Sequence, residues 1–342
     1  MKKDYKYIIY SPFINTGGGK TLLLQLLNEI QNYPNSLVIV DSRISFSFKK
    51  NKKCDVLFIR NTLFSFIQAE YFLYSHSSKK SKILCLHGAP PLIKNLGYVV
   101  VFFHNKLHIF KKISFFNVKE NLKNYFFTKS FNFCDEVIVQ TDSMIYLLNK
   151  FFNKNHVKIK LTMKPFFNFR INKNNTYKKK FDFIYVADAS PHKNQMRLVE
   201  AWILLSMENI KPSLVLTIPC TQQKEIDVIN KLIKKYSLNI YNISDLSLIQ
   251  INNLYAISKR LVYPSLSESF GLPLIEASRH NLYIVASELD YVRDVCEPNY
   301  TFDPLSALSI SRAIKHSLGI LSKIKKPYSA KYFLNNIFKD TK

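Results

Sequence analysis

The sequence predicts an α/β protein with two doubly wound domains that face each other across a cleft. Three observations support this class. Short apolar runs alternate with longer amphipathic stretches, the alternation is interrupted once near the middle, and 342 residues exceed what a single core usually needs. Alternating strands and helices are typical of parallel sheets covered on both faces. Ligands of such sheets bind beyond the carboxyl ends of the strands.

Apolar runs rich in Val, Ile, Leu and aromatic residues are the predicted strands, and stretches such as KTLLLQLLNEI and QMRLVEAWILLSM are predicted helices. The predicted strands cover residues 5–11, 36–41, 55–60, 82–88, 98–104 and 136–141, and then 181–187, 213–218, 238–243, 260–265 and 282–287. A polar, basic stretch, MKPFFNFRINKNNTYKKK, separates the two sets and is typical of a linker. The chain is therefore divided into an N-terminal domain (1–165), a linker (166–180), a C-terminal domain (181–326) and a C-terminal helix (327–342) that can cross back to the first domain.

Composition limits the function classes. Lys and Arg number 49 against 24 Asp and Glu, a net charge of +25, which suits nucleic acid, anionic lipid headgroups or phosphorylated small molecules. A general bias toward Lys, Asn, Ile and Phe explains the same charge without a partner. The five cysteines are scattered without a C-x-x-C, so we expect a reducing compartment and no zinc site. The N-terminus has no signal-peptide pattern and the run YVVVFF is too short to span a bilayer, so we expect a cytoplasmic protein, soluble or peripheral at the membrane.

A run of three glycines, in NTGGGKT, follows the first predicted strand and begins a helix. It is one glycine short of a P-loop, because the leading position is Ile14, and one short of a dinucleotide fingerprint, because the third position is Leu22. Asp41 ends the next strand, where either motif would have an acid. The pattern does predict a loop in which backbone N–H groups and the positive end of a helix face an anionic ligand. The residues of this predicted acceptor or phosphate loop are Gly17, Gly18 and Gly19.

A second loop, in LVYPSLSESFGLPLIEASRHN, carries the stronger signal. Glu268 lies on the loop after a buried strand, Pro273 is predicted to begin a helix, and Glu276 is predicted in its first turn. Gly271 lets backbone N–H groups approach an anion at the helix N-terminus. Acids beside such a site make chemical sense if they bind the hydroxyls of a sugar and a ribose. Helix capping alone would explain Glu276 but not the rest of the loop.

The segment SLSESFGLPLIEA resembles the donor-site motif of the retaining glycosyltransferases of family four, the glycosyltransferases group 1. The similarity extends to YVADASPHKN upstream and to IVAS, DYVRDV and FDP downstream, and is dense over residues 181–315. It implies a GT-B fold, in which two Rossmann-like domains face a cleft. It also implies a retaining, metal-independent enzyme of hexosyltransferase type that needs no cofactor. The donor would be a UDP- or GDP-linked sugar and the acceptor a glycan or lipid-linked molecule, in surface polysaccharide biosynthesis of lipopolysaccharide O-antigen or capsule type.

The resemblance implies roles for individual residues. The expected catalytic residues are Glu268, which would hold hydroxyls of the transferred sugar, Lys193, which would neutralise the diphosphate leaving group, and His104, which would contact the sugar. Glu276 would accept hydrogen bonds from the ribose hydroxyls. The other expected donor-binding residues are Ser269, Phe270, Gly271, Leu272 and Arg197. The glycine loop would lie across the cleft, against the donor phosphate or the acceptor.

This chain departs from the family pattern at three places, one of which is a glycine that is missing after the predicted strand 238–243. Many members have Gly-Arg where this chain has Ala187-Asp188, and the arginine binds phosphate. Asp188 cannot do so, which means that Lys193 acts alone or that another base, such as Arg197, substitutes. A glycine common in the turn after the donor helix is replaced by Asn281, which tolerates a left-handed φ.

The positive charge suits a lipid-linked acceptor at an anionic membrane surface. The predicted contact residues are Lys49, Lys50, Lys52 and Lys53, near the stretches ISFSF and KKISFF, although a solvated basic face explains the same lysines. The alternative functions are a basic nucleic-acid-binding protein or a P-loop-like nucleotide-binding protein. Either leaves the E-x7-E loop unexplained, and we therefore expect a nucleotide-sugar and no nucleic acid as the partner.

Overall fold

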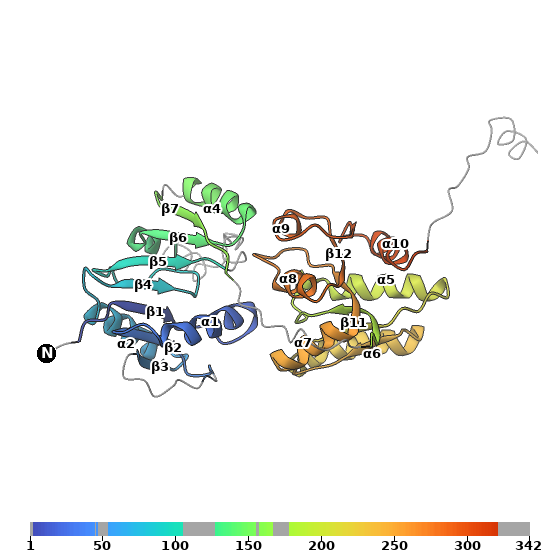
Figure 1. Cartoon of the computed structure of the whole chain (residues 1–342), viewed down its shortest axis with the longest axis horizontal. Helices are drawn as coiled ribbons and strands as arrows, with labels where there is room; N and C mark the ends of the chain where they lie inside the picture. Colours follow the sequence, from blue (N-terminus) through green and yellow to red (C-terminus); the bar gives the residue numbers. More distant parts are fainter. Residues whose placement is uncertain are drawn as a thin grey trace, which may run out of the picture.

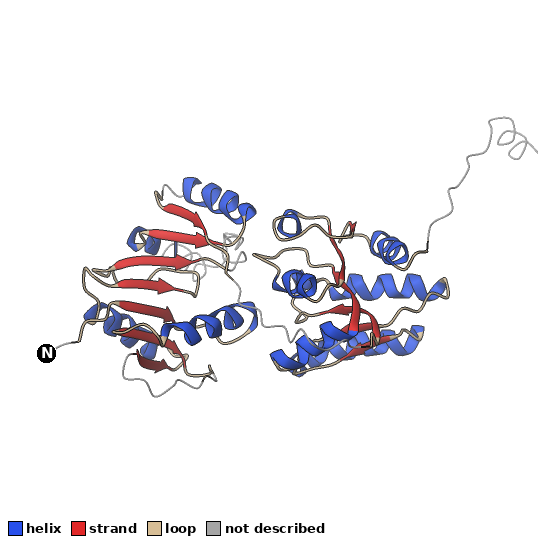
Figure 2. Cartoon of the chain, in the orientation of Figure 1, coloured by secondary structure: helices blue, strands red, loops and turns tan. Residues whose placement is uncertain are grey.

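The computed structural model describes residues 3–44, 46, 54–104, 127–154, 157–166 and 178–320. These residues form two α/β bodies that lie side by side, each built on one sheet (Figure 1). Helices pack against the sheets of both bodies (Figure 2). The predicted fold class, two doubly wound α/β domains, is therefore confirmed.

The N-terminal domain contains a seven-stranded sheet in the order β3-β2-β1-β4-β5-β6-β7, with every neighbouring pair parallel. Its strands are β1 (Tyr7–Ser11), β2 (Ser36–Asp41), β3 (Cys54–Ile59), β4 (Lys82–Cys85), β5 (Tyr98–Phe102), β6 (Glu136–Val139) and β7 (Lys160–Met163). The helices are α1 (Gly17–Ile30), α2 (Leu63–Ser75) and α4 (Asp142–Lys154), with a short 3-10 helix η2 (Phe131–Phe133).

The C-terminal domain contains a six-stranded parallel sheet in the order β10-β9-β8-β11-β12-β13. Its strands are β8 (Phe181–Tyr185), β9 (Leu214–Leu216), β10 (Ile240–Asn242), β11 (Ser258–Tyr263), β12 (Tyr283–Ser287) and β13 (Tyr300–Phe302). The α-helices are α5 (Gln195–Met207), α6 (Gln223–Tyr236), α7 (Leu248–Ile257), α8 (Leu272–Arg279), α9 (Asp290–Arg293) and α10 (Ala307–Ser317). Two short 3-10 helices are η3 (Pro191–Lys193) and η4 (Cys220–Gln222).

Each domain has its own apolar core. Successive residues of the N-terminal strands point to opposite faces, so Tyr10 and Val101 join the cluster beside α2 and α4, whereas Ile9 and Val38 join the cluster beside α1. The core of the C-terminal domain forms around its own strands and the buried Trp202 of α5. Burial on both faces explains why these strands appear in the sequence as nearly continuous apolar runs.

The sheet topology points to the loops where ligands bind. In both sheets the strand order reverses between two adjacent central strands, β1 and β4 in the first and β8 and β11 in the second. Loops at the carboxyl ends of such strands form a crevice, which is where ligands of open α/β sheets bind. The three glycines follow β1, Lys193 follows β8, and Glu268 follows β11. The predicted site residues therefore come from the switch points of both sheets.

The structure differs from the sequence prediction mainly at sheet edges and strand ends. Of the edge strands, β3 and β10 were predicted, whereas β7 and β13 were not. The predicted strand 82–88 ends at Cys85 and the predicted strand 98–104 ends at Phe102, where pairing with the neighbouring strands ends. Most of the predicted linker, residues 167–177, and the predicted helix 327–342 lie outside the described residues.

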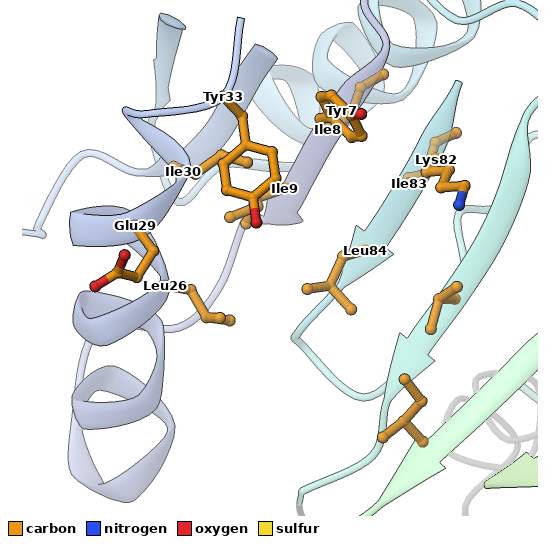
Figure 3. Close-up of a pocket in the computed structure, with 12 residues that line it drawn as sticks. Tyr7, Ile8, Ile9, Leu26, Glu29, Ile30, Tyr33, Lys82, Ile83 and Leu84 are labelled. Carbon is orange, nitrogen blue, oxygen red and sulfur yellow. The ribbon is translucent and has the colours of Figure 1, made fainter. Parts of the chain in front are cut away.

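A pocket of about 340 Å³ opens on the N-terminal sheet between α1 and the first halves of β1 and β4 (Figure 3). Ile9, Leu26 and Leu84 line it, and Glu29 and Lys82 are among the few charged side chains around it. This pocket lies at the amino ends of the strands, whereas the glycine loop follows their carboxyl ends. It is therefore separate from the candidate site described next.

Candidate active site

Two oppositely charged side chains, far apart in sequence, meet in the C-terminal domain. Lys193 is the last residue of η3, and Glu268 lies on the loop between β11 and α8. The Lys193 Nζ lies 2.7 Å from Oε1 of Glu268, and the two side chains are 16% and 12% exposed. A nearly buried ion pair of this kind presents one cation and one acceptor to the same small volume.

Backbone and hydroxyl contacts hold this pair in place. The buried Ser265 has its Oγ 2.6 Å from Oε1 of Glu268 and 3.1 Å from the carbonyl oxygen of His192. The N–H of Leu266 donates to the same carbonyl over 2.8 Å. The hydroxyl of Tyr185 donates to the carbonyl of Lys193 over 2.7 Å. The two loops are therefore joined to each other, which fixes the Lys193–Glu268 geometry.

The loop after β8 depends on a left-handed residue. Asn194 has φ +61° and ends η3, and its amide donates to the carbonyls of Pro264 and Pro304 over 3.1 and 2.8 Å. Asp188 accepts a hydrogen bond from the backbone N–H of Ser190 over 2.8 Å. The residue that replaces the arginine of many family members thus shapes the loop through a local turn.

Arg197, the base suggested as a substitute, lies on α5 and forms an ion pair with Glu200 over 2.7 Å. Both side chains of this pair are more than two-fifths exposed. Such i,i+3 pairs are common on helix surfaces. The donor-binding role of Arg197 therefore stays a prediction, and the geometry around Glu268 includes Lys193 but not this arginine.

Glu276 lies deeper in α8 than predicted. The helix begins at Leu272, so Pro273 is its second residue and Glu276 its fifth, in the second turn instead of the first. The hydroxyl of Tyr255, a buried residue of α7, donates to Oε2 of Glu276 over 3.0 Å. Burial raises the pKa of Glu276, and this hydrogen bond opposes the rise. The sequence carries no motif that marks Tyr255, which looks like any other apolar-face residue of its helix.

The start of α8 brings backbone groups to the junction of the domains. Gly271 precedes the helix with φ +74°, a conformation that residues with a Cβ rarely adopt. Leu272 then packs against the N-terminal cluster that lies beside α1. A Cβ built on Gly18 would lie 3.4 Å from Cδ1 of Leu272, so the N-termini of α1 and α8 are adjacent. Among the described residues, no side-chain hydrogen bond caps either helix at its N-cap, which leaves N–H groups directed at this junction.

The glycine loop and His104 also come together, although the segment from β2 to β5 separates them in the sequence. A Cβ built on Gly19 would lie 2.7 Å from Nε2 of His104, closer than real Cβ contacts allow. The His104 ring is stacked on that of Phe102, with centroids 6.1 Å apart. The absence of a side chain at Gly19 therefore lets the His104 ring lie directly against the first turn of α1.

Further contacts join the start of α4 and the loop before it to the C-terminal domain. The hydroxyl of the buried Thr141 lies 3.5 Å from the carbonyl oxygen of Ser269. The N–H of Ser143 donates to Asp294 over 3.1 Å. In the sequence, Thr141 was indicated only by its position at the end of a predicted strand, where ligands of such sheets bind.

Substitution of Gly19 by alanine is expected to displace the His104 ring, since the new methyl group overlaps Nε2. Gly18→Ala is the matched control, because its Cβ would make only a close van der Waals contact and both changes raise helix propensity alike. If His104 contacts the sugar, Gly19→Ala should lower transfer activity about tenfold or more, as a misplacement of about 1 Å can do. Steady-state kinetics and the His104 ring resonances in NMR spectra would test this, and equal kinetics for the two variants would contradict it.

The alternative nucleotide-binding motifs do not have their expected geometry. Asp41, the acid that a P-loop or dinucleotide motif would need, is buried and accepts a hydrogen bond from Nε of Arg43 over 2.9 Å. Arg43 lowers the pKa of Asp41, so this carboxylate is already satisfied within its own loop. Within the part of the chain that the structure describes, no three His, Cys, Asp or Glu side chains form a cluster able to hold a metal ion.

Known proteins resemble this chain in sequence over its C-terminal half and in fold over both domains. A sequence model of the family Glycosyl transferases group 1 matches residues 166–318, which contain Lys193, Glu268 and Glu276. A search of curated proteins found no match. The C-terminal domain therefore carries the sequence pattern of the group 1 glycosyltransferases.

Solved structures resemble the chain over both domains. HepE from Anabaena, in complex with UDP and glucose, has a TM-score of 0.64 at 14% identity, covering 91% of this chain and 89% of HepE. Sucrose-phosphate synthase from Thermosynechococcus elongatus has a TM-score of 0.67 at 14% identity, covering 92% of this chain and 90% of that enzyme. WaaG, a glycosyltransferase involved in lipopolysaccharide biosynthesis, gives the same values. The likeness establishes the GT-B fold, two Rossmann-like domains facing each other.

Proposed function

We propose that the protein is a retaining glycosyltransferase that moves a sugar from a UDP- or GDP-linked donor to a glycan or lipid-linked acceptor. The observation that carries the proposal is the Lys193–Glu268 pair, held at the switch point of the sheet whose sequence matches the group 1 glycosyltransferases. A cation beside a hydroxyl-binding carboxylate suits a substrate that combines a diphosphate with a sugar.

In this proposal the charge of the leaving diphosphate is stabilised by the Lys193 ammonium and by the N–H groups at the start of α8. Because these cationic and dipolar groups supply the stabilisation, the reaction is proposed to need no metal. Glu268 accepts hydrogen bonds from sugar hydroxyls once the donor binds between it and Lys193. Glu276, oriented by Tyr255, accepts hydrogen bonds from the ribose hydroxyls.

Retention of anomeric configuration is proposed to proceed by departure and attack on the same face of the sugar. Glu268 is ill suited to act as a covalent nucleophile, because its carboxylate is engaged by Lys193 and Ser265. The junction residues Gly19, His104 and Thr141 come from the N-terminal domain and would contact the sugar or the acceptor. An acceptor hydroxyl placed there would be shielded from water by the two domains.

The biological role is proposed to be surface polysaccharide biosynthesis of lipopolysaccharide O-antigen or capsule type, at the inner face of the cytoplasmic membrane. The structural similarity to WaaG and the excess of basic residues support this role. The lysines predicted to contact the membrane, Lys49 to Lys53, lie outside the described residues. In the described ranges, no helix combines the length and apolar character needed to cross a bilayer.

The proposal is tested by measuring thermal unfolding of the protein with UDP, GDP, ATP and their sugar conjugates, without added metal and again with Mg²⁺. A ligand at about one hundred times its Kd stabilises the folded state by about 2.7 kcal/mol, so a genuine site is readily detected. We expect UDP or GDP to raise the Tm of the wild type but not of Glu276→Ala. Stabilisation only by ATP with Mg²⁺ would contradict the proposal. With an active donor identified, proton NMR of the product would report the anomeric configuration, and inversion would exclude the retaining mechanism.

A further inference from the structure

Helix α2 is apolar on both of its sides. Its inner side, including Ala69 and Leu73, is buried in the core of the N-terminal domain. Its outer side exposes large side chains at helical spacing: Leu63 is 76% exposed, Phe64 70%, Ile67 56% and Tyr71 66%. Ordinary surface helices place charged and polar residues on such a side. An exposed apolar stripe of this length indicates an interaction surface.

The loop over residues 91–97 extends this apolar surface. Leu92 and Ile93 are exposed, and their backbone N–H groups donate to Oε2 of Glu70 over 2.9 and 3.2 Å. Glu70 lies on the inner side of α2 and is itself buried, where its other oxygen accepts a hydrogen bond from Tyr10 over 2.7 Å. The loop is thus bound to the helix, and the two expose apolar side chains together. The surface, called the α2 face below, consists of Leu63, Phe64, Ile67, Tyr71, Leu92 and Ile93.

The exposed charges of the segment that carries the α2 face, residues 56–98, have a single sign. Between residues 56 and 98 the sequence contains one acidic residue, the buried Glu70. Exposed basic residues lie at both ends of α2 and within the loop: Arg60 precedes the helix, Lys79 and Lys80 follow it, and Lys94 adjoins Ile93. Apolar and aromatic side chains flanked by cations, without exposed acids, are typical of surfaces that enter the headgroup region of an anionic bilayer.

We propose that the α2 face inserts into an anionic lipid bilayer and docks the protein on the membrane. Leu63, Phe64 and Ile67 would enter the acyl boundary, while the ring of Tyr71 would lie at headgroup level, where aromatic rings with a polar end are favoured. The flanking basic residues would bind the anionic headgroups.

Helix α2 begins near the edge of the sheet that carries the glycine loop of the candidate active site. Phe13, on the loop between β1 and α1, is exposed and packs 5.0 Å from the ring of Phe66 of α2. The start of α2 follows the carboxyl end of β3, the same edge from which Gly17 follows β1. Together with the proposed function, on which this part rests, docking here would present a lipid-linked acceptor at the membrane-facing rim of the site.

Vesicle co-sedimentation of the full chain tests the docking. Phosphatidylcholine vesicles with and without phosphatidylglycerol are compared for the wild type and for Phe64→Ser/Ile67→Ser/Tyr71→Ser. The matched control is Met207→Ser/Leu248→Ser/Ile249→Ser, which removes three equally exposed apolar side chains from the C-terminal domain. We expect the wild type and the control to bind anionic vesicles, and the α2 variant to bind them at least about tenfold more weakly. Substitution of Lys79, Lys80 and Lys94 by serine should abolish the preference for the anionic lipid.

Tryptophan fluorescence can report insertion depth, because the single tryptophan of the chain, Trp202, is buried in the C-terminal domain and a new tryptophan can be placed on the α2 face. Tyr71→Trp should shift its emission to the blue when anionic vesicles are added, whereas Tyr241→Trp, exposed on β10, should not. An unchanged Tyr71→Trp spectrum, or equal vesicle binding by the α2 variant and the wild type, would overturn the proposal. So would dimerisation of the wild type in analytical ultracentrifugation that the α2 variant loses, since the face would then bind a second copy.

Binding of UDP or GDP to the same variants separates the two proposals. Loss of vesicle binding with intact nucleotide binding is the expected behaviour of the α2 variant. If the wild type binds vesicles through this face but binds no nucleotide, the docking proposal holds and the glycosyltransferase proposal fails. If the wild type binds nucleotide but no vesicles, the docking proposal alone is overturned.

Discussion

Lys193→Met is expected to lower kcat for sugar transfer by about 10²- to 10³-fold, the usual effect of removing one group that stabilises charge in the transition state. The ammonium lies in a nearly buried position beside Glu268, where water screens its charge poorly. Its interaction with the leaving diphosphate strengthens as the glycosidic bond breaks, so kcat should fall more than KM rises. Steady-state kinetics with the donor identified by thermal unfolding would measure this.

Lys315→Met is the matched control for that experiment. Lys315 pairs with Glu208 over 2.8 Å and its side chain is 14% exposed, close to the 16% of Lys193, but it joins α10 to α5. Both variants remove one cation from an ion pair of the C-terminal domain, and thermal unfolding would show whether each remains folded. Equal losses of activity in the two variants would mean that Lys193 acts on stability alone.

Glu276→Gln is expected to have opposite effects on nucleotide binding and on stability. Burial raises the pKa of Glu276, so ionising this carboxyl is harder in the folded protein than in the unfolded chain. Its contribution to the free energy of unfolding is therefore full at low pH and is lost as pH rises through the raised pKa. The glutamine variant does not ionise, so its Tm should exceed that of the wild type increasingly as the pH rises from the ordinary glutamate pKa through the raised pKa.

Binding of UDP or GDP should change in the other direction, because the ionised carboxylate is the better acceptor for ribose hydroxyls. A hydrogen bond to a charged group contributes about 1.5–3 kcal/mol, so Glu276→Gln should weaken binding roughly 10- to 150-fold at pH values above the raised pKa, where the wild-type carboxyl is ionised. The affinity of the wild type should fall as pH drops through the raised pKa, and more steeply than that of the variant. Isothermal titration calorimetry would test this, and parallel pH profiles would show that Glu276 does not contact the nucleotide.

The central strands could be predicted from the sequence because burial on both faces leaves a plain apolar run. Strand β2 illustrates this, since all six residues of Ser36–Asp41 are buried and the predicted bounds match. The edge strand β7 lacks this signal: the four residues Lys160–Met163 are all at least partly exposed. Strand ends depend on where the neighbouring strand stops pairing, which is a property of the whole sheet.

The candidate site was predictable where one local segment holds several functional groups, as in the loop from Ser265 to Glu276. Contacts between distant segments were not. No local pattern indicates that Tyr255 would orient Glu276, or that Gly19 would lie against His104. The error in the helical position of Glu276 arose because Pro273 is the second helical residue and the helix starts one residue earlier than expected. Such contacts follow from the packing of whole helices and strands, which the spacing of residues in the sequence does not determine.

The position of Leu272 has a consequence for how temperature acts on the protein. This side chain belongs to the C-terminal domain but packs against the core of the other, so parting the domains transfers it from apolar contact into water. The transfer costs on the order of 1 kcal/mol at room temperature, and this contribution weakens on cooling. Parting also carries a positive heat-capacity change, as exposure of apolar surface always does. Arrhenius plots of turnover should therefore curve wherever separation of the domains limits the rate, and shortening Leu272 to alanine should reduce that curvature.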